Sequence, residues 1–172
     1  MKRNILIILV IIFNIVIDQI SKFIVRAEIA YREVIEIIGE KFILTHVSNT
    51  GAFLGMGSDL NPTLRIIFLL ILPVLVLAYV IYYIFSNKAL DRLSLIAFSC
   101  IVGGGLSNVM DRILYGKVTD FLHIDLGGAV RTGIFNIADM SVTFGMIVLL
   151  YASFKNTKRN KVRKEEMIID RD

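Results

Sequence analysis

Residues 103–139 read GGGLSNVMDRILYGKVTDFLHIDLGGAVRTGIFNIAD, and they join the end of one long apolar run to the start of the last one. Two carboxylates in this stretch, Asp120 and Asp139, lie 19 residues apart. Asp139 falls in the first turn of an apolar segment, and Asp120 falls in a short connection of half-buried composition. Because ionisable groups at membrane depth are costly unless they are paired or face a wet cavity, we interpret the two as an acid/base dyad.

Composition places this stretch in a membrane protein. The chain has 172 residues, 56% of them hydrophobic, and a mean hydropathy of +0.72. A helix needs about 20 apolar residues to cross the hydrocarbon layer. Four runs have roughly this length: 5–25, 64–85, 93–113 and 137–154. The sequence therefore predicts an all-α membrane protein, a four-transmembrane-helix bundle formed by residues 1–154.

The distribution of charge predicts the orientation of the bundle. Of the 19 basic residues, 11 fall on the side shared by the two termini. Since Lys and Arg accumulate on the cytoplasmic side, both termini are expected there, with the two long connections outside. Residues 155–172 form a basic cytoplasmic tail with no core pattern, expected to be disordered near anionic membrane lipids. The net charge of +4 comes without a basic face carrying interleaved aromatics, so nucleic acid is not an expected partner.

The first outer segment, residues 30–60, has the character of strands. Val34–Ile38 and Lys41–Val47 are β-prone runs separated by Gly39-Glu40, which predicts a small extracytoplasmic β-sheet. Residues 49–55 follow and combine turn-forming with apolar residues, as expected of a loop that dips into the membrane interface. Asn49 could bind a peptide backbone there, or could form an ordinary Asx turn.

Residues of the first three spans include an ion-pair candidate, a proline and a cysteine. Asp18 and Lys22 are four residues apart, which suits either a substrate or proton contact or a structural ion pair near the interface with Lys22 snorkelling; we favour the structural pair. The second span holds Pro73, which should kink or loosen it, and is otherwise almost without polar residues, so we assign it a scaffolding role. Cys100 is alone in an apolar run and is interpreted as a packing residue.

The third span carries an unusual set of small and polar residues. Gly103–Gly105 predict either a close helix contact or a surface against which substrate backbone lies. Asn108 and Arg112 share a helix face, with Asp111 beside them. These three form either a structural network or a substrate-orienting group.

The chemistry follows from the two carboxylates. Asn136 is a credible N-cap of the fourth span and places Asp139 near the positive end of the helix dipole. Two carboxylates within about 3 Å share one proton, so one can accept a proton from water while the other donates to a carbonyl oxygen. This is an aspartic peptidase mechanism, which needs no metal or cofactor. The sequence has no His-Glu-x-x-His and no Gly-x-Ser-x-Gly motif. The alternative is a small ion-coupled transporter or channel subunit, because such proteins also bury carboxylates.

Five motifs, in order along a four-span frame, resemble those of the lipoprotein signal peptidases, the type II signal peptidases of bacteria. They are Asp18-Gln19-Ile20-Ser21-Lys22, Asn49-Thr50-Gly51-Ala52, Gly103-Gly104 through Asn108 with Asp111-Arg112, Val118-Thr119-Asp120-Phe121, and Phe135-Asn136-Ile137-Ala138-Asp139. The resemblance implies a membrane aspartic endopeptidase of the bacterial inner membrane that removes the signal peptide of prolipoproteins just before a diacylglyceryl-modified cysteine.

The resemblance also assigns roles to single residues. It makes Asp120 and Asp139 the catalytic pair. The residues expected to bind substrate or support the dyad are Asn49, Gly51, Gly104, Asn108, Asp111, Arg112 and Asn136. It further implies an extracytoplasmic β-cradle and inhibition by the cyclic peptide globomycin. Two positions depart from the family pattern: Ser107 replaces the usual glycine before Asn108, and Leu54 stands where a phenylalanine is expected.

Overall fold

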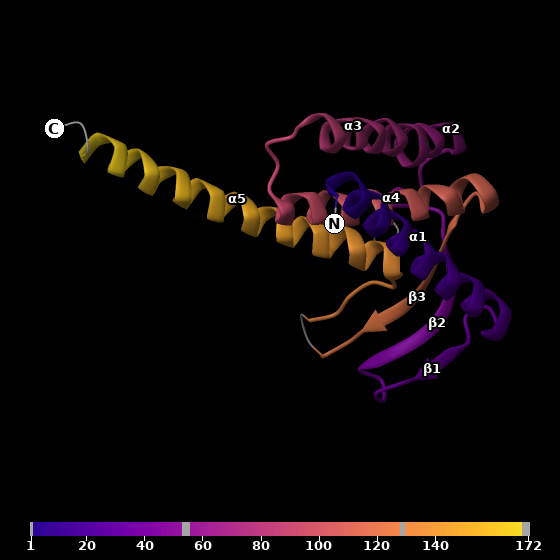
Figure 1. The fold of residues 1–172 in the computed structure, drawn as a ribbon. Coiled ribbons are helices and arrows are strands. Elements are labelled where there is room, and N and C mark those ends of the chain that lie inside the picture. Colours follow the sequence, from indigo (N-terminus) through magenta and orange to yellow (C-terminus); the bar gives the residue numbers. More distant parts are fainter. Residues whose placement is uncertain (1, 53–55, 128–129, 170–172) are drawn as a thin grey trace.

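The computed structural model describes residues 2–52, 56–127 and 130–169, and it consists of long helices with a small sheet beside one end of them (Figure 1). The elements are α1 Arg3–Glu28, β1 Val34–Glu36, β2 Phe42–Asn49, α2 Pro62–Arg65, the π-helix η2 Ile66–Ile71, α3 Leu72–Ser86, α4 Arg92–Tyr115, β3 Val118–Ile124 and α5 Ile137–Ile169. Four segments in the described part are long and apolar enough to cross a membrane: Arg3–Glu28, Pro62–Ser86, Arg92–Tyr115 and Ile137–Thr157. The predicted four-helix bundle with a small sheet is confirmed.

Helix α4 is the centre of the bundle, and its three glycines explain how it fits there. A Cβ on Gly103 would lie 2.7 Å from Cβ of Asn14 in α1, and one on Gly105 would lie 2.7 Å from Leu77 Cδ2 in α3. A Cβ on Gly104 would collide with the carbonyl oxygen of Ala138 in α5. Because successive helical residues point about 100° apart, the three glycines admit a different helix on each of three faces. The interpretation of this triplet as a close helix contact is confirmed.

The second span is continuous from Pro62 to Ser86 but changes its winding. Residues Ile66–Ile71 form a π-helix directly before Pro73. A proline inside a helix has no N–H to donate and crowds the carbonyl four residues earlier, and a wider turn relieves this crowding. The expected loosening of this span at Pro73 is therefore observed.

The sheet has the strand order β1-β2-β3 with both pairs antiparallel. The predicted hairpin of β1 and β2 is present, with Val34 opposite Thr45, and β3 adds a third strand from a segment far along the chain. Nearly all of β3 is buried because it lies between β2 and the helices. Its Phe121 and Leu122 pack with Val25 of α1, so the sheet is fixed to the end of the bundle.

Residues after Lys155 were expected to be disordered, but α5 continues as helix to Ile169 and extends away from the rest of the fold (Figure 1). That prediction was wrong because a polar, charge-rich composition does not by itself end a helix.

Cys100 is 7% exposed, and its Sγ lies 3.9 Å from the amide nitrogen of Asn14, as expected of a packing residue.

Candidate active site

Asp120 is positioned by a short connection and by strand pairing. Helix α4 ends at Tyr115 and is capped by Gly116, whose φ of 70° is accessible to glycine at little cost, and β3 begins two residues after Gly116. The β2–β3 register sets Ser48 opposite Thr119 and so brings the end of β2 beside Asp120. Asn49 Nδ2 then donates to Asp120 Oδ2 at 2.8 Å.

Asp139 is positioned by the same strand. Phe135 exchanges backbone hydrogen bonds with Leu122 of β3, at 2.9 and 2.8 Å, so α5 must begin next to the sheet. The backbone N–H of Asp139 donates to Asn136 Oδ1 at 2.9 Å, and the backbone N–H of Asn136 donates to Asp139 Oδ2 at 3.2 Å. This reciprocal cap confirms the prediction that Asn136 begins the last span, and it fixes the Asp139 side chain.

Two asparagine amides join the carboxylates. Asn136 Nδ2 donates to Asp120 Oδ1 at 2.6 Å, and Asn108 Nδ2 donates to Asp139 Oδ1 at 2.9 Å. The two amides also meet each other, since Asn136 Nδ2 lies 3.2 Å from Asn108 Oδ1. Segments that are far apart in sequence therefore deliver both carboxylates to one hydrogen-bonded group.

Burial gives Asp120 an unusual titration. Its side chain is 2% exposed, and this loss of hydration raises its pKa to about 6 from the ordinary 3.8. The hydrogen bond from Asn49 lowers this pKa, the charge of Asp139 raises it, and Asn136 and Lys22 lower it further. Asp120 consequently exchanges its proton close to neutral pH, where a catalytic acid is useful.

Both carboxylates line a cavity of about 630 Å³. Its polar end is formed by Asn49, Asn108, Arg112, Asp120 and Asp139. Its other walls are apolar and come from the second span, α4 and α5; they include Phe68, Leu69, Pro73, Met146, Ile147 and Leu150. The scaffolding role assigned to the second span is thus incomplete, because three of its residues form a wall of the site. Pro73 was the one sequence signal that could have indicated this.

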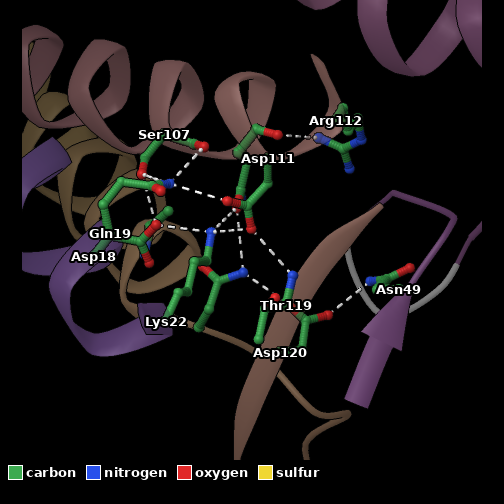
Figure 2. Close-up of polar contacts among 12 residues, drawn as sticks. Asp18, Gln19, Lys22, Asn49, Ser107, Asp111, Arg112, Thr119 and Asp120 are labelled. Carbon is green, nitrogen blue, oxygen red and sulfur yellow. Dashed lines mark hydrogen bonds and ion pairs between the residues drawn. The ribbon is translucent and has the colours of Figure 1, made fainter. Parts of the chain in front are cut away.

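A buried charge cluster supports the site from the side of α1 (Figure 2). Lys22 is fully buried, and its Nζ lies 2.7 Å from Asp18 Oδ2 and 3.2 Å from Asp111 Oδ2. The expectation that Lys22 snorkels is wrong, because its acceptors lie inside the bundle. Lys22 also donates to Asn108 Oδ1 at 2.8 Å, which orients the Asn108 amide so that its NH₂ faces Asp139.

The remaining predicted residues divide between the cluster and the cavity. Asp111 belongs to the cluster, where it also accepts from the backbone N–H of Thr119 at 3.1 Å (Figure 2). Arg112 faces the cavity instead, and its Nη2 donates to the carbonyl oxygen of Gly51 at 2.9 Å. Asn49 forms the Asx turn, since its Oδ1 accepts from Gly51 N–H at 2.8 Å, and its amide also donates to Asp120, a contact that the sequence did not indicate.

Sequence comparison agrees with this architecture. The family described as signal peptidase (SPase) II matches residues 10–155, which is most of the chain. The chain belongs to the signal peptidase II family. The resemblance noted in the five motifs is confirmed, and nothing in the comparisons favours the transporter alternative.

Relatives and solved structures of similar proteins extend over nearly the whole chain. Lipoprotein signal peptidases of Staphylococcus aureus strains JH9 and Newman are each 32% identical to this signal peptidase II over 158 residues, covering 92% of this chain and 93% of theirs. A bacterial membrane enzyme solved by the in meso method at 2.3 Å resolution is 29% identical, with a TM-score of 0.78 over 89% of this chain and 90% of that one. A second such structure, at 1.9 Å, has a TM-score of 0.75. This signal peptidase II is accordingly a multi-pass bacterial membrane protease.

The structure explains one departure of this signal peptidase II from the family pattern. Ser107 is fully buried, and its hydroxyl donates to Asp18 Oδ2 at 2.6 Å and accepts from Gln19 Nε2 at 2.9 Å. The serine hydroxyl therefore adds two hydrogen bonds between α1 and α4 that a glycine could not form. Leu54, the second departure, lies outside the described residues.

Gln19 and Thr119 are supporting residues that sequence reasoning did not single out. Gln19 also donates to Asp111 Oδ1 at 3.1 Å, and Thr119 Oγ1 accepts from Arg26 at 3.0 Å. Both residues are inside motifs quoted for the family, which is the signal that could have found them.

Proposed function

We propose that Asp120 and Asp139 are the catalytic dyad with which this signal peptidase II removes signal peptides from diacylglyceryl-modified prolipoproteins. The observation that carries the proposal is that both carboxylates, delivered by β3 and α5, share the Asn108–Asn136 amide pair and line one cavity. Asn49, Gly51, Gly104, Asn108, Asp111, Arg112 and Asn136 hold the dyad or the substrate, while Asp18 and Lys22 support them structurally.

The environments of the two carboxylates suggest separate roles. Asp139 accepts from the backbone N–H of Asn136 at the start of a helix, and from the Asn108 amide, which favours its anion. Asp120, with its pKa near 6, is assigned the role of proton donor. Asp139 then takes a proton from a water molecule, whose oxygen adds to the scissile carbonyl carbon while Asp120 protonates the carbonyl oxygen.

The tetrahedral product collapses when the proton held by Asp139 passes to the peptide nitrogen. The C–N bond breaks, the new carboxylic acid ends the signal peptide, and the amine becomes the N-terminus at the modified cysteine. Asp120 takes its proton back from the collapsing hydroxyl, so the dyad returns to its starting state.

The walls of the cavity suit a lipid-modified peptide. Phe68, Leu69, Met146, Ile147 and Leu150 offer an apolar surface of the kind that acyl chains or a signal-peptide helix can contact, and the polar residues lie at one end. Globomycin, a cyclic peptide, is expected to occupy the same space and block cleavage.

The charge distribution supports a cytoplasmic location for both termini. Residues 1–154 are then the peptidase domain, residues 155–172 a basic cytoplasmic extension, and the dyad lies near the outer face of the bacterial cytoplasmic membrane.

The decisive experiment is cleavage of a diacylglyceryl-modified precursor by the purified protein in detergent, with and without globomycin. Asp120→Asn and Asp139→Asn should each lower kcat/KM by about 10²-fold or more, since each removes one partner of the proton transfer. Asp125→Asn is the matched control, because Asp125 is a partly exposed carboxylate whose partner, Arg131, lies at 3.2 Å. Parental turnover in either dyad variant would reject the proposal.

A further inference from the structure

A second, smaller cavity lies next to the catalytic one. It has a volume of about 260 Å³ and shares Arg112 and Leu69 with the larger cavity. Arg65, in the first turn of the second span, provides its other cation, and Thr50 provides a hydroxyl. Ile66 and Leu70, which belong to the same span as Arg65, line the cavity with apolar side chains.

The two guanidinium groups of this cavity do not contact an acidic side chain in the described residues, although Asp120 and Asp139 line the adjacent cavity that Arg112 also borders. Within the described residues, neither Arg65 nor Arg112 forms an ion pair, whereas the buried Lys22 contacts both Asp18 and Asp111. The Nε atoms of Arg65 and Arg112 are buried and have no acceptor in the described part of the chain. The terminal nitrogens of Arg112 donate hydrogen bonds to the backbone carbonyl oxygens of Gly51 and Asn108.

The Nε of Arg3 also lacks an acceptor in the described residues, but Arg3 lines neither of the two cavities. Buried N–H groups that lack a protein acceptor need one from another molecule. Two guanidinium groups beside one cavity select an anion with several oxygen atoms, and phosphate fits their planar donors best.

The position of the cavity identifies the source of the phosphate. Arg65 begins the second span, and Arg112 lies in the last turn of α4, so both are at the membrane-interface end of their helices. Phospholipid headgroups lie at this depth in either leaflet, and guanidinium groups bind phosphate through charge-assisted hydrogen bonds. The neighbouring Ile66, Leu69 and Leu70 would contact the acyl chain. We propose that this cavity binds the phosphate of an anionic phospholipid between Arg65 and Arg112.

Hydrogen bonds connect this lipid site to the catalytic aspartate. Arg112 holds the Gly51 carbonyl, Gly51 N–H holds Asn49 Oδ1, and Asn49 holds Asp120. A bound phosphate would immobilise Arg112 and with it this chain of contacts. Anionic lipid should therefore increase cleavage, an effect that rests on the proposed function, whereas the binding itself does not.

Native mass spectrometry of the full-length protein in detergent tests the binding. Phosphatidylglycerol should be retained over phosphatidylcholine, and Arg65→Gln should weaken that retention at least about fivefold, the contribution expected of one cation. Arg131→Gln removes the same charge from an exposed ion pair and should have no effect. Equal retention by Arg65→Gln and the parent, or equal loss in both variants, would overturn the site. Displacement of phosphatidylglycerol by millimolar inorganic phosphate would show a free-anion site instead of a lipid site.

Cleavage in vesicles tests the coupling. Adding phosphatidylglycerol to phosphatidylcholine vesicles should raise kcat/KM of the parent and of Arg131→Gln but not of Arg65→Gln. If Arg65→Gln responds like the parent, the coupling to Asp120 is wrong. If the parent cuts the precursor in neither membrane, the proposed function fails while the binding result still decides the lipid site.

Discussion

Gly104→Ala is the substitution for which the structure makes the sharpest prediction. An added Cβ would lie well inside 3.0 Å of the Ala138 carbonyl oxygen, a separation that real Cβ atoms essentially never show, and 3.0 Å from Val142 Cγ2. The obstacle is backbone, so no side-chain rotation can relieve it. Helix α5 must move away from α4.

The separation of α4 and α5 should reduce both the stability of the protein and its catalytic rate. Close-packed helices have no spare volume, so we expect α4 and α5 to separate by about 0.5–1 Å and the protein to lose about 1–3 kcal/mol of stability. Ala138 is next to Asp139, and the Asn108–Asp139 hydrogen bond of 2.9 Å spans the same two helices. A displacement of about 1 Å at reacting groups costs about 10²-fold in rate, so kcat should fall by this amount.

The assay compares Gly104→Ala with Gly105→Ala, the neighbouring and chemically identical change. At Gly105 the new methyl group would meet only the side chain of Leu77, which can rotate. Because Gly105 also lines the catalytic cavity, the sharper comparison is stability, and we expect Gly105→Ala to unfold at a higher temperature than Gly104→Ala. Thermal unfolding in detergent and precursor cleavage measure the two effects. If the two variants behave alike, α4 and α5 are not packed as described, and the proposed support of Asp139 by this contact is refuted.

Two further predictions concern charge. Because the pKa of Asp120 is about 6 and its neutral form is the proposed proton donor, kcat/KM should decline with a slope of one proton as pH rises above about 6; a flat profile to pH 8 would remove Asp120 from that role. Lys22→Met should cost about 3–5 kcal/mol of stability in denaturant or thermal unfolding, because it strands Asp18 and Asp111 without their buried cation. Arg131→Gln, which breaks an exposed pair, should cost under about 1 kcal/mol, and an equal loss in both variants would contradict the central role of Lys22.

Local patterns in the amino-acid sequence are sufficient to predict several features of this protein. Four apolar runs are long enough to cross a membrane, whatever packs around them, and their boundaries differ from the helices by only a few residues except at the end of α5. Asn136 capping Asp139 and the hairpin of β1 and β2 are also local, since each involves residues close in the chain. The glycine triplet indicated close packing for the same reason.

The contacts between distant residues depend on long-range packing and could not be predicted from local patterns. The position of β3 beside β2 brings Asn49 to Asp120 across 71 residues, and nothing in either segment specifies the other. Lys22 became a fully buried cation because Asp111 and Asn108 of α4 face it, and a pattern within α1 could not reveal those partners. Asp111 and Arg112 are adjacent in sequence yet point into different environments. Side-chain periodicity fixes the directions along one helix, whereas long-range packing determines what lies in each direction.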